Sequence, residues 1–425
     1  MRPWKLLAAA VAASGMVSSA AADGPRFVTT TDLIELREIA DMRGEGLSLS
    51  PDGDHVAFLM RQASVAANDY EVAWYVASTD ADSTPIRVDD GGDPTLFRNV
   101  QPGGRPSGAW IADRAQWSPD GRGIAYRKRV GGATQVWWSR RDGRDTKQLS
   151  HSAADVDEFY WNADGSRILF ATDVDRAQFQ KVNASCFRNG HVYDYDKEWS
   201  TIDGRPYYPR YLLTNGKPRI RVLDVASREE RPATDDERME FERLRRGVPS
   251  TEIAQNARKV AHREGRGGIA WLQADDPDKQ GMYPPLTVYA SHSSDGEAPI
   301  RCSAEACTGL MELSRFLRHG IHWDANAGEV YFVRREGKGY SKQSLYGWSV
   351  GQDRVRRILT THEWISDCSI AQGRAICFRE SPSAPRTLVA IDLENGATET
   401  LFDPNPEFRN IVLGDAELLL ADTDL

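Results

Sequence analysis

The sequence has no excess of positive charge and no long apolar segment beyond its first twenty or so residues. Lys and Arg number 53 against 62 Asp and Glu, which gives a net charge of -9. Surfaces that bind nucleic-acid phosphates are usually basic, so we expect no nucleic-acid partner. A membrane helix needs about 20 consecutive apolar residues, so we expect no span once the N-terminal segment is removed.

Signatures of metal and cofactor sites are also missing. His319 and His322 are three residues apart, but no third or fourth ligand follows at a recognisable zinc spacing. Asp194 and Asp196 lack the glycine and the distal glutamate of a calcium loop. We therefore expect neither a metal nor a cofactor.

One motif imitates a catalytic site. Residues 347–351 read Gly-Trp-Ser-Val-Gly, which matches the serine-hydrolase elbow. That elbow needs a strand before it, a helix after it, and an Asp and a His later in the chain. Here Ser349 lies in a repeated strand motif, another strand pattern follows, and only His362 lies downstream. We therefore predict that Ser349 is a strand residue and that this chain contains no catalytic residue.

The N-terminus has the pattern of a secretory signal peptide over residues 1–22. Arg2 and Lys5 precede a short apolar run from Leu6 to Val17, and Ala20 to Ala22 give a small-residue cleavage pattern. This predicts a periplasmic or secreted protein.

Export permits disulfides, and the five cysteines suit that setting. If Gln372 and Gly373 form a hairpin turn, Cys368 faces Cys377 at a position where the Cα atoms of paired strands come closest. Cys302 and Cys307 form a second candidate pair across a small loop, and Cys186 is left over. Buried free thiols are the alternative.

A repeated hairpin dominates the rest of the chain. Ser-Pro-Asp-Gly occurs at 50–53 and 118–121, each time between runs of alternating apolar residues. Pro presets φ at the second turn position, and Gly accepts the positive φ that follows. Weaker copies begin near 162, 264, 324 and 372, and a second hairpin follows each copy. Two hairpins make four strands, and a unit of about 45 residues is typical of a β-propeller blade.

The pattern predicts an all-β chain: a propeller of six to seven four-stranded blades over 46–404, in a complete or incomplete ring. A segment over 23–45 precedes it, with a short capped helix at Asp32 that carries Leu33, Leu36, Ile39 and Ala40 on one side. Residues 405–425 are either a partial last blade, beginning with a strand from Phe408, or a linker. An unclosed ring would leave strand edges unpaired, so closure has to come from an N-terminal strand, from six blades, or from further residues.

Two segments interrupt the period in and after the third unit. The insertion at about 176–217 is rich in tyrosine and arginine, residue types that are enriched at binding hot spots. Tyr207, Tyr208 and Arg210 are its candidate substrate-binding residues if it forms a lid over a peptide; an insertion packed on the side of the propeller is the alternative. After this unit, Thr234 to Glu237 form a capping box that opens a charged, solvent-facing helix to Arg246.

These features together resemble the N-terminal propeller of serine peptidases of the prolyl oligopeptidase family. The run Thr30 to Ile39 followed by Ser48 to Gly53 is similar to the opening of that family. Three further stretches resemble its exported lasso peptide isopeptidase branch: Asn68 to Tyr70 with Trp74 to Val76, Ala154 to Asp157 with Phe159 to Trp161, and Asn405 to Arg409.

The resemblance implies a propeller that admits and holds a peptide beside a C-terminal α/β-hydrolase domain with a Ser-His-Asp triad. For the isopeptidase branch it implies a threaded macrolactam peptide as the substrate. The sequence departs from the family because no hydrolase domain follows the last blade motif, so we expect that domain to be missing or encoded separately. A stand-alone, TolB-like propeller that binds peptides or envelope proteins is the alternative.

Overall fold

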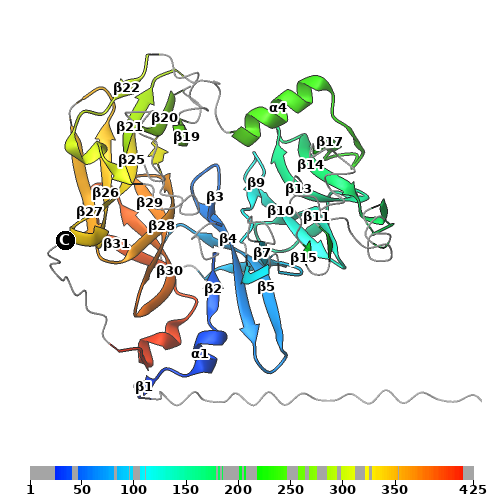
Figure 1. The fold of residues 1–425 in the computed structure, drawn as a ribbon, viewed down its shortest axis with the longest axis horizontal. Helices are drawn as coiled ribbons and strands as arrows, with labels where there is room; N and C mark the ends of the chain where they lie inside the picture. Colours follow the sequence, from blue (N-terminus) through cyan, green and yellow to red (C-terminus); the bar gives the residue numbers. More distant parts are fainter. Residues whose placement is uncertain are drawn as a thin grey trace, which may run out of the picture.

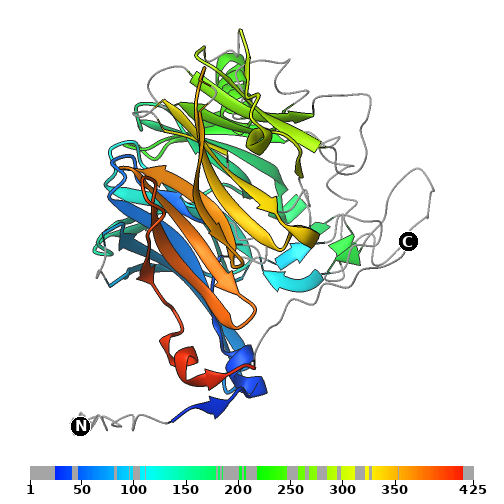
Figure 2. The same ribbon diagram turned by 90° about the vertical axis from the view of Figure 1, so that its left-hand side faces the viewer.

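The structure is a computed structural model that describes residues 24–40, 46–80, 84–94, 96–98, 106–110, 112–178, 180–181, 184, 201–202, 205–206, 218–246, 257–263, 268–274, 285–293, 298–311, 321–324, 328–352 and 354–414. Within these residues the chain forms six antiparallel sheets of four strands each, and in two of them one edge strand is broken into two pieces. The sheets stand side by side around a common axis (Figure 1, Figure 2). The predicted all-β propeller is therefore confirmed, with six blades.

Each blade follows the chain in order, so neighbouring strands in sequence are neighbours in the sheet. The first blade contains β2 (Arg37–Ile39), β3 (Ser48–Leu49), β4 (His55–Ser64), β5 (Asp69–Ser78) and β6 (Ile86–Asp90). The second contains β9 (Gln116–Trp117), β10 (Gly123–Val130), β11 (Ala133–Arg140) and β12 (Thr146–Gln148). The third contains β13 (Ala154–Trp161), β14 (Arg167–Asp175), β17 (Arg219–Asp224) and β18 (Glu230–Pro232).

The second half of the ring repeats this order. The fourth blade contains β19 (Ala257–Arg263), β20 (Gly268–Ala274), β21 (Pro285–Ser291), β22 (Ile300–Arg301) and β23 (Leu310–Met311). The fifth contains β24 (Ile321–Trp323), β25 (Glu329–Glu336), β26 (Lys342–Ser349) and β27 (Val355–Thr361). The sixth contains β28 (Trp364–Ala371), β29 (Arg374–Ser381), β30 (Ala384–Asp392) and β31 (Thr398–Phe402).

Short elements complete the described part of the chain. The two-stranded pairings are β7 (Leu96–Arg98) with β8 (Pro106–Trp110), β15 (Thr201–Ile202) with β16 (Arg205–Pro206), and β1 (Arg26–Phe27) with β32 (Ile411–Val412). The helices are α1 (Thr30–Ile34), α4 (Asp235–Arg246), and the 3₁₀ helices η1 (Glu305–Cys307), η2 (Lys338–Tyr340) and η3 (Pro406–Asn410). In the described residues no helix has the length and apolar character needed to cross a membrane.

The Ser-Pro-Asp-Gly motifs form the turns that the sequence predicts. Gly53 N–H donates to Ser50 O at 2.9 Å, and Gly121 N–H donates to Ser118 O at 2.8 Å. Both glycines have positive φ, 79° and 67°, a conformation that disfavours residues with a Cβ. These turns therefore fix where each blade's first hairpin begins.

Hydrophobic clusters between neighbouring blades hold the ring together. Buried residues join the first blade to the second, the second to the third, the fourth to the fifth, and the fifth to the sixth. A further cluster joins the sixth blade to the first, with Phe58 on β4 packed among Ile376, Phe378 and Leu388. The ring thus closes by packing of the last blade on the first rather than by a shared strand. Among the described residues no such cluster joins the third blade to the fourth.

Polar contacts reinforce this closure where the chain enters and leaves the propeller. The Asn405 side chain accepts from Arg37 N–H at 2.9 Å and donates to Arg37 O at 2.9 Å, so it binds the start of β2 as a neighbouring strand would. Beyond it, β32 pairs in parallel with β1. The strand predicted from Phe408 is wrong for residues 408–410, which lie in η3, and β32 pairs with β1 instead of opening a seventh blade.

The prediction that Leu33, Leu36, Ile39 and Ala40 share one side of an N-terminal helix is also wrong. Thr29 caps α1 in a capping box with Asp32, but the helix ends at Ile34. Leu33 is 56% exposed, whereas Ile39 lies in β2 and is 1% exposed. Pairing of β2 with β4 and packing on the sixth blade outweigh the local helical spacing, so the first blade begins at Arg37, before the predicted boundary at residue 46.

The predicted capping box at Thr234 is present at the start of α4. Glu237 N–H donates to Thr234 Oγ1 at 3.3 Å, and Thr234 N–H donates to Glu237 Oε2 at 2.9 Å. The helix is not a purely solvated one, because Phe241 is fully buried against Leu169 and Val222 of the third blade. It thereby covers the face of that blade that is turned away from the second blade (Figure 1).

Glu237 gives this helix a pH-dependent attachment. Arg231 donates to both carboxylate oxygens, at 2.8 and 2.6 Å, and Arg167 donates at 2.8 Å. These bonds from Arg231, together with those from Thr234, lower the pKa of Glu237 from 4.5 to about 2. A carboxyl with a lowered pKa stabilises the fold above its unfolded-state pKa, and this contribution is lost as the pH falls through the folded-state pKa.

We therefore expect Glu237→Gln to lower the free energy of unfolding by about 1–3 kcal/mol at pH 7. The difference in free energy of unfolding between this variant and the unsubstituted protein should become smaller as the pH falls from about 4.5 toward about 2. Urea unfolding at a series of pH values measures it, with Glu240→Gln on the same helix as the matched control. A difference that is unchanged down to pH ~3 would contradict this assignment.

Candidate functional site

The two ends of the blades form two different faces of the ring. The turns that resemble Ser-Pro-Asp-Gly lie on one face. The tips that join the two middle strands of a blade lie on the other, including residues 64–69, 130–133, 336–342 and 381–384. We call this second face the hairpin-tip face. It also carries the connections from β12 to β13 and from β27 to β28, and β2 and β24 start there.

The strand ends that flank the insertion and the start of the propeller both lie on the hairpin-tip face. The insertion joins β14 to β17, which are the two middle strands of the third blade. Val65 N–H, at the tip of the β4–β5 hairpin, donates to Glu35 Oε1 at 2.8 Å and so places the segment after α1 on this face. Figure 2 shows α1, β1 and η3 together at the end of the first and sixth blades. Tyr207, Tyr208 and Arg210, the predicted substrate-binding residues, lie outside the described residues.

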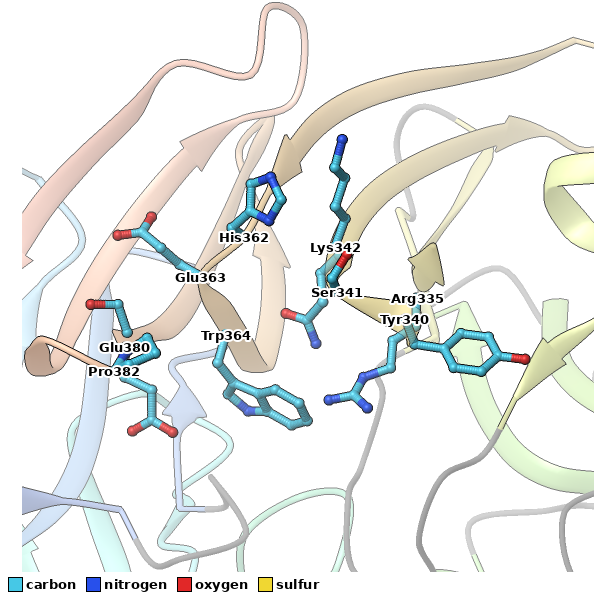
Figure 3. Close-up of a pocket in the computed structure, with 11 residues that line it drawn as sticks. Arg335, Tyr340, Ser341, Lys342, His362, Glu363, Trp364, Glu380 and Pro382 are labelled. Atoms are coloured by element: carbon cyan, nitrogen blue, oxygen red, sulfur yellow. The ribbon is translucent and has the colours of Figure 1, made fainter. Parts of the chain in front are cut away.

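A cavity of ≈ 390 Å³ opens on this face between the fifth and sixth blades. Its walls come from the ends of β25, β26, β28 and β29 and from η2. Arg335, Lys342 and His362 supply basic groups, and Trp364 and Tyr340 supply aromatic surface (Figure 3). The cavity lies where the core between these two blades ends, and most of its lining residues are polar or charged.

Arg335 in this cavity has a buried N–H group without a hydrogen-bond acceptor among the described residues. Its guanidinium carbon lies 4.3 Å from the centre of the Trp364 ring. Its Nε–H is buried and finds no acceptor among the described residues. Burial without a neighbouring carboxylate lowers the pKa of Arg335. The site therefore holds a cation that a bound anion would stabilise.

Sequence reasoning missed these cavity residues, although a signal was present. Tyr331, Val333 and Arg335 alternate along β25 toward the sixth blade, and Gln343 and Leu345 do the same on β26. Arg335 on β25 and Gln343 on β26 are thus polar residues at the ends of rows of side chains that face the sixth blade and are otherwise largely apolar. Such a break in the alternation marks a place where the blades separate.

The structure places Ser349 at the end of strand β26, as the sequence predicts. Its hydroxyl donates to Glu329 Oε1 at 3.0 Å, and β27 follows in the same sheet. The matching position in the second blade is Ser139, whose hydroxyl bonds to Tyr126 and Thr146 inside the sheet. Both serines therefore lie near the ends of middle strands and bond within their own sheets, and neither lies in a strand-to-helix elbow.

The structure joins the cysteines in the two predicted pairs. Cys368 and Cys377 are disulfide-bonded with Cα atoms 4.1 Å apart, across the turn at Gln372 and Gly373. Cys302 and Cys307 are disulfide-bonded around η1. All four are buried in inter-blade clusters. Cys186 lies outside the described residues.

The acidic and histidine residues considered as metal ligands do not gather at one place in the described part of the chain. Asp155 and Glu158 lie within β13, the edge strand of the third blade, and pair with Arg176 at 2.9 Å and Arg245 at 3.0 Å. His322 lies in β24, and His319, Asp194 and Asp196 lie outside the described residues. In the part of the chain that the structure describes, no three His, Cys, Asp or Glu side chains gather as metal ligands would.

Comparison with known proteins adds a relative over nearly the whole chain. Lasso peptide isopeptidase AtxE2 of Asticcacaulis excentricus is 30% identical over 420 residues, which cover 95% of this chain. The chain is homologous to AtxE2. It spans about half the length of that relative, since the match covers 54% of AtxE2. No family model matches the chain.

Solved structures of AtxE2 share the fold described above. A variant of AtxE2 with Astexin3-dC4 bound superposes with a TM-score of 0.72 at 27% identity, over 91% of this chain and 55% of that one. AtxE2 without ligand gives a TM-score of 0.71 at 28% identity, over 92% of this chain and 56% of that one. The six-bladed ring is therefore similar to about half of a peptide-binding isopeptidase.

Proposed function

We propose that this chain is the substrate-admitting and substrate-holding propeller of a serine peptidase of the prolyl oligopeptidase family that acts as a lasso peptide isopeptidase. The observation that carries the proposal is homology to AtxE2 over 95% of the chain, together with the TM-score of 0.72 to AtxE2 bound to Astexin3-dC4. The hairpin-tip face supports it, because α1, the strand ends that flank the insertion and the cavity all lie there.

The proposal assigns the bond-breaking groups to a domain other than the propeller. In this proposal a Ser-His-Asp triad on an α/β-hydrolase domain attacks the isopeptide carbonyl, and the propeller holds the peptide beside it. The strand position of Ser349 supports this division, because its hydroxyl donates to a carboxylate within its own sheet. The N-terminal pattern and the two disulfides support a periplasmic location.

Titration of the chain with Astexin3-dC4 tests the proposal. We expect saturable binding of one peptide per chain in isothermal calorimetry, and weaker binding of an unthreaded peptide of the same sequence. No binding of the threaded peptide at about 100 µM would contradict the proposal. Equal binding of both forms would favour a stand-alone peptide-binding propeller instead.

A further inference from the structure

The cavity between the fifth and sixth blades contains two buried hydrogen-bond donors that find no acceptor in the part of the chain that the structure describes. One is Nε of Arg335, and the other is the Nε2 amide of Gln343. Gln343 is 3% exposed, and Ile365 N–H donates to its Oε1 at 2.5 Å, which fixes the amide with its NH₂ group on the other side. Most buried donors in folded proteins find a partner, so two that face one cavity can be satisfied there by water or by the acceptor of a ligand.

The charges around the cavity favour an anionic ligand. Two carboxylates lie in its wall, but Arg379 donates to Glu363 at 2.5 Å and Arg386 donates to Glu380 at 2.9 Å. Each acid is thereby neutralised by an arginine of its own blade. Arg335 has no such partner among the described residues, and burial without a compensating acid lowers its pKa. The Lys342 side chain extends away from Arg335 and Trp364, so Arg335 is the cation that faces the indole (Figure 3). The cavity therefore carries positive charge that its own acids do not balance.

The size and the donors of the site suit one terminal or side-chain group rather than a whole peptide. The guanidinium of Arg335 and the indole of Trp364 lie side by side, and Lys342 stands on the wall contributed by β26 (Figure 3). A cavity of ≈ 390 Å³ accommodates one residue and its terminal group. Guanidinium binds carboxylate through a pair of parallel N–H···O bonds, and the Gln343 amide supplies another donor.

We propose that this cavity is a subsite that binds a carboxylate of the peptide, with Arg335 and Gln343 as its donors and Trp364 as its apolar wall. The inference rests on the proposed function, because it assigns one group of that peptide to one place on the hairpin-tip face. The carboxylate belongs either to the peptide C-terminus or to an Asp or Glu side chain. Both present the same two oxygens.

Binding of acid and amide forms to paired variants tests the subsite. We expect Arg335→Met to weaken binding of Astexin3-dC4 about 10- to 100-fold, as loss of a charge-assisted hydrogen bond does. The matched control is Arg334→Met, the neighbouring residue on the same strand, whose side chain donates to Glu305 O on the fourth blade and lies outside the cavity. It should bind like the unsubstituted chain.

The peptide forms distinguish the two sources of the carboxylate. If the C-terminus occupies the subsite, the C-terminal amide should bind the unsubstituted chain as weakly as the acid binds Arg335→Met. In Arg335→Met the acid and the amide should bind equally. If an Asp or Glu side chain occupies the subsite, the peptide with Asp→Asn or Glu→Gln should bind the unsubstituted chain weakly. It should then bind Arg335→Met as well as the acidic peptide does. Equal effects of Arg335→Met on every peptide form would overturn the proposal.

A small probe separates this inference from the proposed function. If Astexin3-dC4 fails to bind the unsubstituted chain, the proposed function fails for that peptide. The subsite is then tested with N-acetylphenylalanine against N-acetylphenylalanine amide by saturation-transfer NMR. A signal for the acid alone that disappears in Arg335→Met supports the subsite, and equal signals for both probes overturn it.

Stability distinguishes a binding role for Arg335 from a structural one. A half-buried cation with an unsatisfied donor costs folding free energy, and an apolar residue of similar length removes that cost. Arg335→Met should therefore melt at the same temperature as the unsubstituted chain or higher while losing acid binding. A melting temperature lowered by more than about 5 °C would make Arg335 a structural residue and overturn the proposal.

Discussion

Phe58→Ala should lower the free energy of unfolding by about 3–5 kcal/mol and separate the first blade from the sixth. Phe58 is fully buried on β4 and packs within the cluster that joins these two blades. Its ring centroid lies 5.7 Å from that of Phe402 on the sixth blade and 6.0 Å from that of Tyr75 on its own blade. Alanine would leave a cavity at the closure of the ring, where no shared strand holds the blades together.

Urea unfolding followed by circular dichroism measures the loss, and hydrogen exchange locates it. Relative to the unsubstituted protein, we expect amide exchange in Phe58→Ala to become faster in β4, β29 and β30. Exchange in the fourth blade, which lies outside the affected cluster, should change less. Phe27→Ala is the matched control, because Phe27 is 80% exposed and the same substitution there should cost less than about 0.5 kcal/mol. A loss at position 58 no larger than at position 27 would show that the blades do not depend on this contact.

Local signals in the sequence predicted the blades well because each depends on a few adjacent residues. The turn at Gly53 needs only a proline, a short polar residue and a glycine in order. The same holds for Gln372 and Gly373, which both have positive φ and set Ala371 opposite Arg374. From that register the pairing of Cys368 with Cys377 followed without knowledge of the rest of the fold.

Contacts between distant segments could not be predicted in this way. Ile39 fits a helical stripe in its own neighbourhood, and it lies in a strand because β4 and the sixth blade bury it there. Asn405 looks like a loop residue, and only the ring geometry brings its amide to Arg37. Arg335 ends an apolar row on its own strand, but its importance comes from the sixth blade, which offers Trp364 and whose two nearby carboxylates are already paired with Arg379 and Arg386.

Lys128→Met should destabilise the fold by about 3–5 kcal/mol, because it leaves a buried carboxylate without its cation. The Lys128 side chain is 5% exposed, and its ammonium lies 2.8 Å from both Asp89 and Asp90 at the end of β6. It also lies 4.6 Å from the centre of the Trp137 ring. This group on β10 therefore ties the first blade to the second by charge as well as by packing.

The response of the network to a second substitution makes this prediction specific. Asp89 also accepts from the Tyr126 hydroxyl at 2.6 Å, and burial together with this carboxylate raises the pKa of Tyr126. Tyr126 therefore stays a neutral donor that keeps its hydrogen bond to Asp89 but supplies no positive charge. Asp89→Asn removes the uncompensated charge while keeping an acceptor for Tyr126. The double variant of Lys128→Met with Asp89→Asn should thus be more stable than Lys128→Met alone.

Lys147→Met provides the exposed counterpart of the same chemistry. Lys147 lies 4.6 Å from the centre of the Trp138 ring and 4.0 Å from Asp145, but its side chain is 36% exposed. Water screens such a pair, so its removal should cost less than about 1 kcal/mol. Urea unfolding of the three variants measures the series. If the Asp89→Asn change further destabilises Lys128→Met, the cost comes from lost packing of the lysine stem, and the blades are not joined by a buried ion pair.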